Sequence, residues 1–314
     1  MFSSQTSTPP VRQPTATTLP EWAPFALIAL IWVPALMRFS VEWSFNPQYY
    51  YGWSVPLLAG YLIFDRWPMR PSVGVPRVFW PVVFVIILAA LPQFPLRLLG
   101  EANSTARLIT LAMGGIAVAI SLGTLYLYGG SRWSLYFAAP VAFLLVAMPW
   151  PGQIETPLVQ GLMKVNAEIA ANIVAIVGIP AEARGNVIEV PTGLLGVNEA
   201  CSGIRSLQST LMAAAFLGLL YRRSLVGLVG LVALGSLIAF VCNVIRTTFL
   251  TYQGATNGID AVDKWHDSAG FVILGVVLVS LWLMSQLLEM AEKRENEAAK
   301  SKSPVSSLDS ERNV

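Results

Sequence analysis

The chain has 314 residues, of which 55% are hydrophobic and only 12% are charged. Soluble domains carry roughly 25% charged residues, so this chain has too few to cover the surface of a water-soluble globule. A net charge of +2 is too balanced for a nucleic-acid-binding protein, and two cysteines cannot form a disulfide framework. A single histidine excludes zinc motifs built on paired histidines. Composition therefore indicates a polytopic membrane protein.

The polar ends and the apolar middle predict three regions. Residues 1–22 are rich in Ser, Thr, Pro and Gln, without the apolar core and cleavage site of a signal peptide. We expect them to form a disordered cytoplasmic tail. Residues 23–290 form the multi-span membrane domain. Residues 291–314 are charged, and we expect a helix extension followed by a solvated cytoplasmic tail.

Eight apolar segments in the middle region approach the roughly 20 residues that a spanning helix needs. In chain order these predicted spans are 24–37, 49–64, 78–99, 108–128, 133–149, 202–220, 225–245 and 268–288. The first two are short or contain proline. The predicted fold class is an all-α, polytopic transmembrane helical bundle of about eight spans.

The long connection at 150–200 carries structure of its own. Segment 157–177 mixes apolar positions with Lys164, Asn166, Glu168 and Asn172, which predicts a surface-lying or cavity-lining amphipathic helix in place of a ninth span. Two short apolar runs, 186–190 and 194–197, flank Pro191-Thr192-Gly193 and predict a small hairpin.

Loop charges set the expected orientation. With eight spans, one side of the membrane receives Arg66, Arg70, Arg77, Arg132, Arg222 and Arg223 together with both chain ends. The connection at 150–200 falls on the other side, and its two basic residues are outnumbered by five acidic ones. We therefore expect both termini in the cytoplasm and residues 150–200 outside it.

This orientation brings three reactive side chains to one membrane face. Cys201 lies at the outer start of the sixth predicted span, Arg246 at the outer end of the seventh, and His266 at the outer start of the eighth. A helix start favours a cysteine thiolate, which is the nucleophilic form. His266 could take the thiol proton and return it to a leaving amine. Cys201 as a small packed residue, and His266 as an interfacial residue beside Trp265, remain alternatives.

Arg246 also has two interpretations. It could be a fixed donor that stabilises an oxyanion or clamps a carboxylate, or it could extend to the membrane interface from the end of its helix. Asn243, one turn earlier, could orient it.

Arg205, Asn198 and Asp267 are further candidates for supporting roles, because they flank the reactive residues. Cys242 lies in an apolar helix, where simple packing is the expectation. We expect no disulfide between Cys201 and Cys242, since it would silence the nucleophile.

At these residues the chain resembles the exosortase/archaeosortase family of polytopic membrane cysteine transpeptidases. The resemblance rests on residues 199–207 (Glu-Ala-Cys-Ser-Gly-Ile-Arg-Ser-Leu), on 243–246 (Asn-Val-Ile-Arg) and on Trp265-His266-Asp267. The order Cys, Arg, His on three successive spans also agrees. The similarity extends roughly over residues 24–288, but only the part from Cys201 to His266 is specific.

The resemblance implies an enzyme of the bacterial inner membrane with Cys201 as nucleophile and Arg246 and His266 as partners. Its substrates would be exported, membrane-anchored proteins with a C-terminal sorting tail of the PEP-CTERM type, which has a Pro-Glu-Pro signature, a spanning helix and a basic end. The family is associated with exopolysaccharide machinery. No cofactor, metal or nucleic acid is implied, and the acceptor (amine, lipid, sugar or water) stays open.

Two other functions remain compatible with the residues alone. A transporter or channel subunit would use Arg246 and Asn243 to line a substrate path. A non-catalytic assembly factor for polysaccharide export would form no covalent intermediate. An intramembrane metalloprotease is disfavoured, because one histidine leaves too few ligands.

Overall fold

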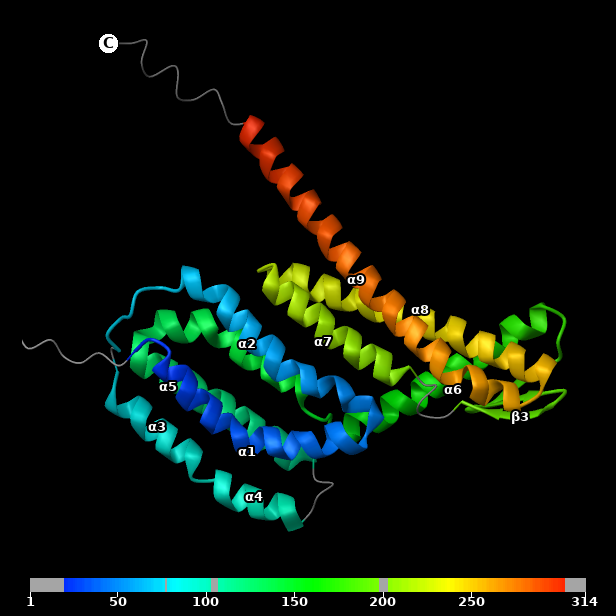
Figure 1. Ribbon diagram of the computed structural model, residues 1–314, viewed down its shortest axis with the longest axis horizontal. Helices are drawn as coiled ribbons and strands as arrows, with labels where there is room; N and C mark the ends of the chain where they lie inside the picture. Colours follow the sequence, from blue (N-terminus) through cyan, green and yellow to red (C-terminus); the bar gives the residue numbers. More distant parts are fainter. Residues whose placement is uncertain (1–19, 77, 103–106, 198–202, 303–314) are drawn as a thin grey trace, which may run out of the picture.

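The computed structural model describes residues 20–76, 78–102, 107–197 and 203–302 (Figure 1). Helices dominate, and each of the eight predicted apolar segments is mostly helical over its described part. The helical elements run α1 (Ala23–Phe45), η1 (Pro47–Ser54), α2 (Val55–Arg66), η2 (Trp67–Met69), α3 (Trp80–Ala90), α4 (Gln93–Ala102), α5 (Arg107–Phe143), η3 (Leu144–Ala147), α6 (Gly152–Ile176), α7 (Ile204–Leu220), α8 (Leu225–Asn257) and α9 (Asp260–Lys302).

Five segments of the described chain are long and apolar enough to cross a membrane. They are Ala23–Phe45, Trp80–Gly100, Arg107–Ala147, Leu225–Asn257 and Asp260–Ala291, and α7 is a shorter apolar helix. The apolar side chains on their outer surfaces are largely exposed, as expected for helices that face lipid. The predicted all-α polytopic bundle is thus confirmed.

Helix α5 is a helical hairpin and supplies two of the predicted spans. Gly130 has φ +74° and ψ −171°, a backbone conformation that interrupts the helix and that glycine tolerates. The chain reverses direction there. The reversal is evident from Arg107 Nη1, at the start of α5, which donates to the carbonyl oxygen of Trp150, 43 residues later, at 3.2 Å. The residues before and after Gly130 therefore form antiparallel helices, as the separate predicted spans 108–128 and 133–149 require.

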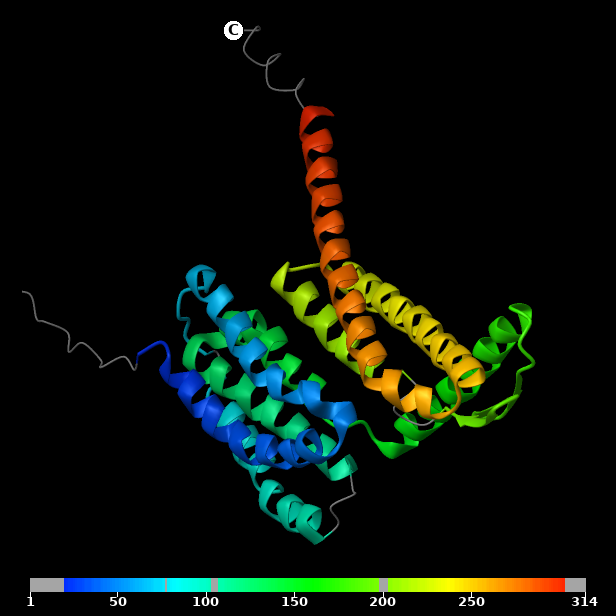
Figure 2. The same cartoon turned by 45° about the vertical axis from the view of Figure 1, so that its right-hand side comes forward.

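The helices form two groups that lie side by side (Figure 2). The first group comprises α1, α2 and α5, packed around an aromatic core, with α3 and α4 along the outer side of α5; its largest fully buried members are Trp32, Phe39, Tyr49, Trp133 and Phe137. The second group comprises α7, α8 and α9, and its core includes Leu231 and Leu281. α7 contacts α2, α5 and η1, so it joins the two groups.

A small sheet covers one end of the second group. Strands β1 (Glu182–Arg184), β2 (Val187–Val190) and β3 (Gly193–Gly196) form an antiparallel sheet in the order β1-β2-β3. The predicted hairpin at 186–197 is confirmed, and the sheet has a further strand, β1, that was not predicted. α6 has a buried face (Val159, Met163, Ala170) that packs against this sheet and against the last turns of α8, as an amphipathic helix should.

The contacts also sort the helix ends into two levels. Arg66 donates to the carbonyl oxygens of Tyr136 on α5 (3.1 Å) and Leu219 on α7 (3.2 Å), and Arg223 donates to that of Ser285 on α9 (2.9 Å). Arg222 pairs with Asp65 at 3.6 Å. These arginines, which the sequence analysis placed on one side, do lie at one end of the bundle. The opposite end carries α6, the sheet and the candidate site.

Candidate functional site

Arg246 and His266 are in direct contact at the end of the bundle near the sheet. Arg246 Nη2 lies 3.1 Å from His266 Nε2 and donates to the backbone carbonyl oxygen of His266, also at 3.1 Å. A guanidinium has only donors, so His266 Nε2 must accept, which places the proton of a neutral imidazole on Nδ1. Because Arg246 is only 8% exposed, protein groups rather than bulk water surround its charge.

Arg246 lies within α8 and not at its end, which corrects the prediction that this helix stops at residue 245. α8 continues to Asn257 because α6 and the sheet bury its last turns, including Leu250 and Ala255. Burial of Arg246 also contradicts the alternative in which its side chain extends to the interface. Similarly, α9 begins at Asp260, so His266 lies in its second turn rather than before it.

Asn243 and Gly203 bring the start of α7 against α8. Asn243 is buried, and a Cβ added to Gly203 would lie 2.6 Å from Asn243 Cγ. Gly203 has φ +84°, which non-glycine residues rarely adopt, so both the close approach and the backbone require glycine there. Gly203 is two residues after Cys201 in the chain.

These residues line a cavity of about 550 Å³ between η1, α7, α8 and α9. Its polar lining comprises Arg205, Ser206, Ser209, Asn243, Arg246 and His266, and Phe271, Ile273 and Leu274 of α9 form an apolar wall. Two arginines and no acidic residue are among its described lining residues, so the cavity favours anionic or carbonyl-rich ligands.

The structure leaves part of the predicted site outside its description. Cys201 and Asn198 lie outside the described residues, as does the side chain of Asp267. Arg205 is exposed and lines the cavity, whereas Cys242 is a partly buried free thiol that packs against the core of α7, α8 and α9. Within the described part of the chain, no group of three or more His, Cys, Asp or Glu side chains is arranged to hold a metal ion.

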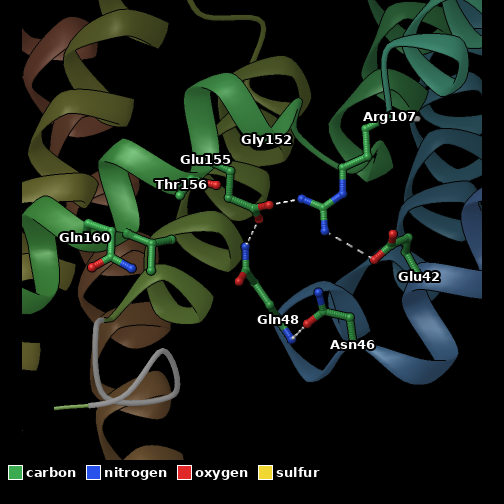
Figure 3. Close-up of a pocket in the computed structure, with 9 residues that line it drawn as sticks. Glu42, Asn46, Gln48, Arg107, Gly152, Glu155, Thr156 and Gln160 are labelled. Atoms are coloured by element: carbon green, nitrogen blue, oxygen red, sulfur yellow. Dashed lines mark hydrogen bonds and ion pairs between the residues drawn. The ribbon is translucent and has the colours of Figure 1, made fainter. Parts of the chain in front are cut away.

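A second polar pocket, of about 370 Å³, lies on the other side of η1. Figure 3 shows Arg107 between two carboxylates: it pairs with Glu155 of α6 and lies 3.5 Å from Glu42 of α1. Gln48 of η1 donates to the same Glu155 carboxylate. The ion pair therefore fixes η1 between α1, α5 and α6.

Tyr49 extends this network to α7. Its hydroxyl donates to Glu155 Oε1 at 2.5 Å and accepts from the backbone N–H of Trp150 at 2.9 Å and from Gln208 Nε2 at 3.5 Å. Gln208 lies on α7 and follows Cys201 by seven residues in the sequence. Since Tyr50 and Tyr51 of η1 line the larger cavity, the network holds one wall of that cavity against α7.

We expect the Arg107→Ala variant to lose about 3 kcal/mol of unfolding free energy, because a buried carboxylate that loses its cation is strongly destabilising. A thermal-unfolding midpoint measured in detergent reports the loss. Lys164→Ala is the matched control: its ion pair with Glu168 is 3.9 Å long and solvent-exposed, so we expect a change within about 0.5 kcal/mol. Equal midpoints for the two variants would contradict a stabilising role for Arg107.

Glu155, Arg107, Tyr49 and Gln208 were not identified from the sequence as a group. Arg107 and Glu155 are charged residues close to apolar segments, a position that usually indicates a functional role or an ion-pair partner. Nothing in the sequence indicates that they pair, because 48 positions separate them.

Comparison with known proteins identifies the family of the chain. The profile of the transmembrane exosortase family (Exosortase EpsH) matches residues 43–283, more than three-quarters of the chain. No curated protein and no solved structure matches it. The matched range includes the Cys201 segment and both members of the Arg246–His266 contact. It also includes all or most of each predicted span except the first. The chain is a multi-pass membrane protein that belongs to the transmembrane exosortase family.

Proposed function

We propose that this protein is an integral-membrane cysteine transpeptidase that cleaves the C-terminal sorting tails of exported, membrane-anchored proteins. Cys201 is its nucleophile, and Arg246 and His266 are its partners. The observation that supports this most strongly is the contact of Arg246 with His266 on the wall of a cavity that Gly203, two residues from Cys201, also lines. Membership of the exosortase family supports the same reaction class.

The reaction begins when His266 takes the proton of the Cys201 thiol and the resulting thiolate attacks the carbonyl carbon of the scissile peptide bond. The carbonyl oxygen becomes an oxyanion, which the guanidinium of Arg246 stabilises by donating hydrogen bonds. The C–N bond breaks and the leaving amine takes the proton that His266 received from the thiol. The acyl group is now a thioester on Cys201, and an acceptor amine, hydroxyl or water displaces the sulfur and regenerates the thiol.

The chemistry of the larger cavity suits such a substrate. Arg205 and Arg246 line it with no acidic residue among its described lining, which fits the glutamate of a Pro-Glu-Pro signature. Phe271, Ile273 and Leu274 of α9 offer an apolar wall to the start of the substrate's own spanning helix. The Cys201→Ala variant, assayed with a tail-bearing substrate, tests the proposal: processing that continues unchanged would overturn it.

The proposed location is the inner membrane, with both termini in the cytoplasm and the site outside it. The arginine-rich end of the bundle supports this orientation through the positive-inside rule. It places the tails at 1–22 and 291–314 in the cytoplasm and residues 150–200 outside, so that the site faces proteins that have already been exported. The exopolysaccharide machinery would then be a neighbour on the same side.

In intact cells of a Cys201→Ala/Cys242→Ala background, we expect a Glu189→Cys variant to react with a membrane-impermeant maleimide. An Arg222→Cys variant should react only after the membrane is opened. Both positions are exposed, so access to the reagent depends on the side of the membrane. The reverse labelling pattern would overturn the orientation.

A further inference from the structure

The outer edge of β3 presents unpaired backbone groups. Val190 pairs with Gly193 across the two-residue turn Pro191-Thr192, and Val197 N–H donates to the Asn186 carbonyl oxygen at 2.8 Å. In an antiparallel ladder the hydrogen-bonding direction alternates along the strand. Gly193 and Leu195 therefore bond to β2 and Val197 bonds to Asn186 just before it, while the N–H and C=O groups of Leu194 and Gly196 point away from the sheet. Neither residue makes a further hydrogen bond within the described chain.

This edge is also open and uncharged. Leu194 is 64% exposed, and a Cβ added to Gly196 would meet nothing within 4 Å. The opposite edge differs, because β1 carries the charged residues Glu182 and Arg184. Arg184 donates a hydrogen bond to Glu182 and forms ion pairs with Glu182 and Glu189, and these contacts raise the pKa of its guanidinium. Charged residues on an edge strand discourage pairing with another chain. β1 has that protection and β3, with the sequence Gly-Leu-Leu-Gly, does not.

The position of β3 relates this edge to the proposed site. The strand ends five residues before Cys201 in the chain. At that end Gly196 and Val197 line a small cavity together with Thr247, the residue after Arg246. Thr192, at the other end of β3, donates to the Gly254 carbonyl oxygen of α8 at 2.8 Å. In Figure 1 the sheet accordingly lies beside the turn between α8 and α9.

We propose that the free edge of β3 binds an extended segment of the protein substrate as a fourth, added strand. The inference rests on the proposed function, since it names how the same site recognises its substrate. A peptide must be extended around its scissile bond for a thiolate to reach the carbonyl carbon, and β3 leads directly into the segment that carries Cys201. Strand addition supplies affinity through main-chain hydrogen bonds, so the substrate contributes mainly backbone to this contact, with an apolar side chain over Leu194.

Proline at an outward-facing position removes one donor from the edge without removing a ladder bond. We expect Gly196→Pro to raise the KM for a tail-bearing substrate about fivefold, the effect of losing one net hydrogen bond, with kcat within about twofold. Ala183→Pro is the matched control, because the parity of the β1–β2 pairing also turns its N–H outward, on the other edge. That variant should leave KM unchanged. The assay uses the full-length protein in lipid bilayers, and thermal midpoints confirm that each variant is folded.

A second experiment tests strand addition even if a proline variant does not fold. In a Cys201→Ala background, Leu194→p-benzoylphenylalanine should photo-crosslink to the uncleaved substrate, whereas Glu182→p-benzoylphenylalanine should not. An unchanged KM in Gly196→Pro, crosslinking from Glu182 equal to that from Leu194, or a crosslink from Leu194 to a second copy of this chain would each overturn strand addition. These results are separate from failure of the proposed function, which would appear as substrate processing that persists in Cys201→Ala.

Discussion

Replacing Cys201 by alanine is expected to lower the rate of tail processing by at least about 10³-fold, because a thioester needs a thiol and the second cysteine of the chain, Cys242, packs against the core of α7, α8 and α9. The measurement is the rate of release of the C-terminal tail from a co-reconstituted substrate. Cys242→Ala provides the control. It removes the second cysteine of the chain, which is partly buried against the core of α7, α8 and α9, and it should retain activity within about twofold.

This pair of variants also separates the enzyme from the two other functions that the residues alone allow. A transporter subunit that uses Arg246 and Asn243 to line a path would tolerate loss of the Cys201 thiol. So would a non-catalytic assembly factor. If the Cys201→Ala variant keeps the full function of the protein in the cell, the transpeptidase proposal is wrong and those two alternatives remain.

The second large effect is expected at Arg246. Lysine keeps the positive charge but offers no planar fork of donors, so Arg246→Lys should lose the paired contact with the ring and the carbonyl oxygen of His266. We expect kcat to fall by about 10²-fold to 10³-fold, the usual cost of removing an oxyanion donor, with little change in KM. Single-turnover rates of thioester formation measure the chemical step directly.

Arg205→Lys is the matched comparison for Arg246→Lys, because Arg205 lines the same cavity from its exposed rim. A side chain that only binds the substrate affects KM more than kcat, so this variant should show the opposite split. Equal effects of the two substitutions on kcat would contradict a specific role for Arg246 in the chemical step.

The apolar helices, including the five segments of the described chain that are long enough to cross a membrane, could be predicted from sequence because lipid imposes a simple requirement of length and hydrophobicity. Even α5, a continuous helical element apart from Gly130, was divided correctly, since the Gly129-Gly130 pair and Arg132 interrupt its apolar run. The helix ends were less predictable. α8 continues past Arg246 because its last turns pack against α6 and the sheet. A hydropathy pattern carries no information about such contacts.

The candidate site was predictable only in part. Counting spans placed Arg246 and His266 at one level, and the structure brings them within 3.1 Å. Their burial, and the fit of Asn243 against Gly203, depend on packing between α7 and α8. The ion pairs of Arg107 with Glu155 and Glu42 join three helices across long stretches of sequence, which no local pattern encodes. β1 was missed because three residues with alternating charge resemble a loop.

Trapping the acyl-enzyme tests the central claim most directly. The protein is incubated with a tail-bearing substrate, quenched in acid and digested, and the peptide containing residue 201 is examined by mass spectrometry. The account predicts an added mass equal to the acyl fragment of the substrate on Cys201, which hydroxylamine removes and which Cys201→Ala lacks. A substrate that is processed with no such adduct, or an adduct on a residue other than Cys201, would contradict it.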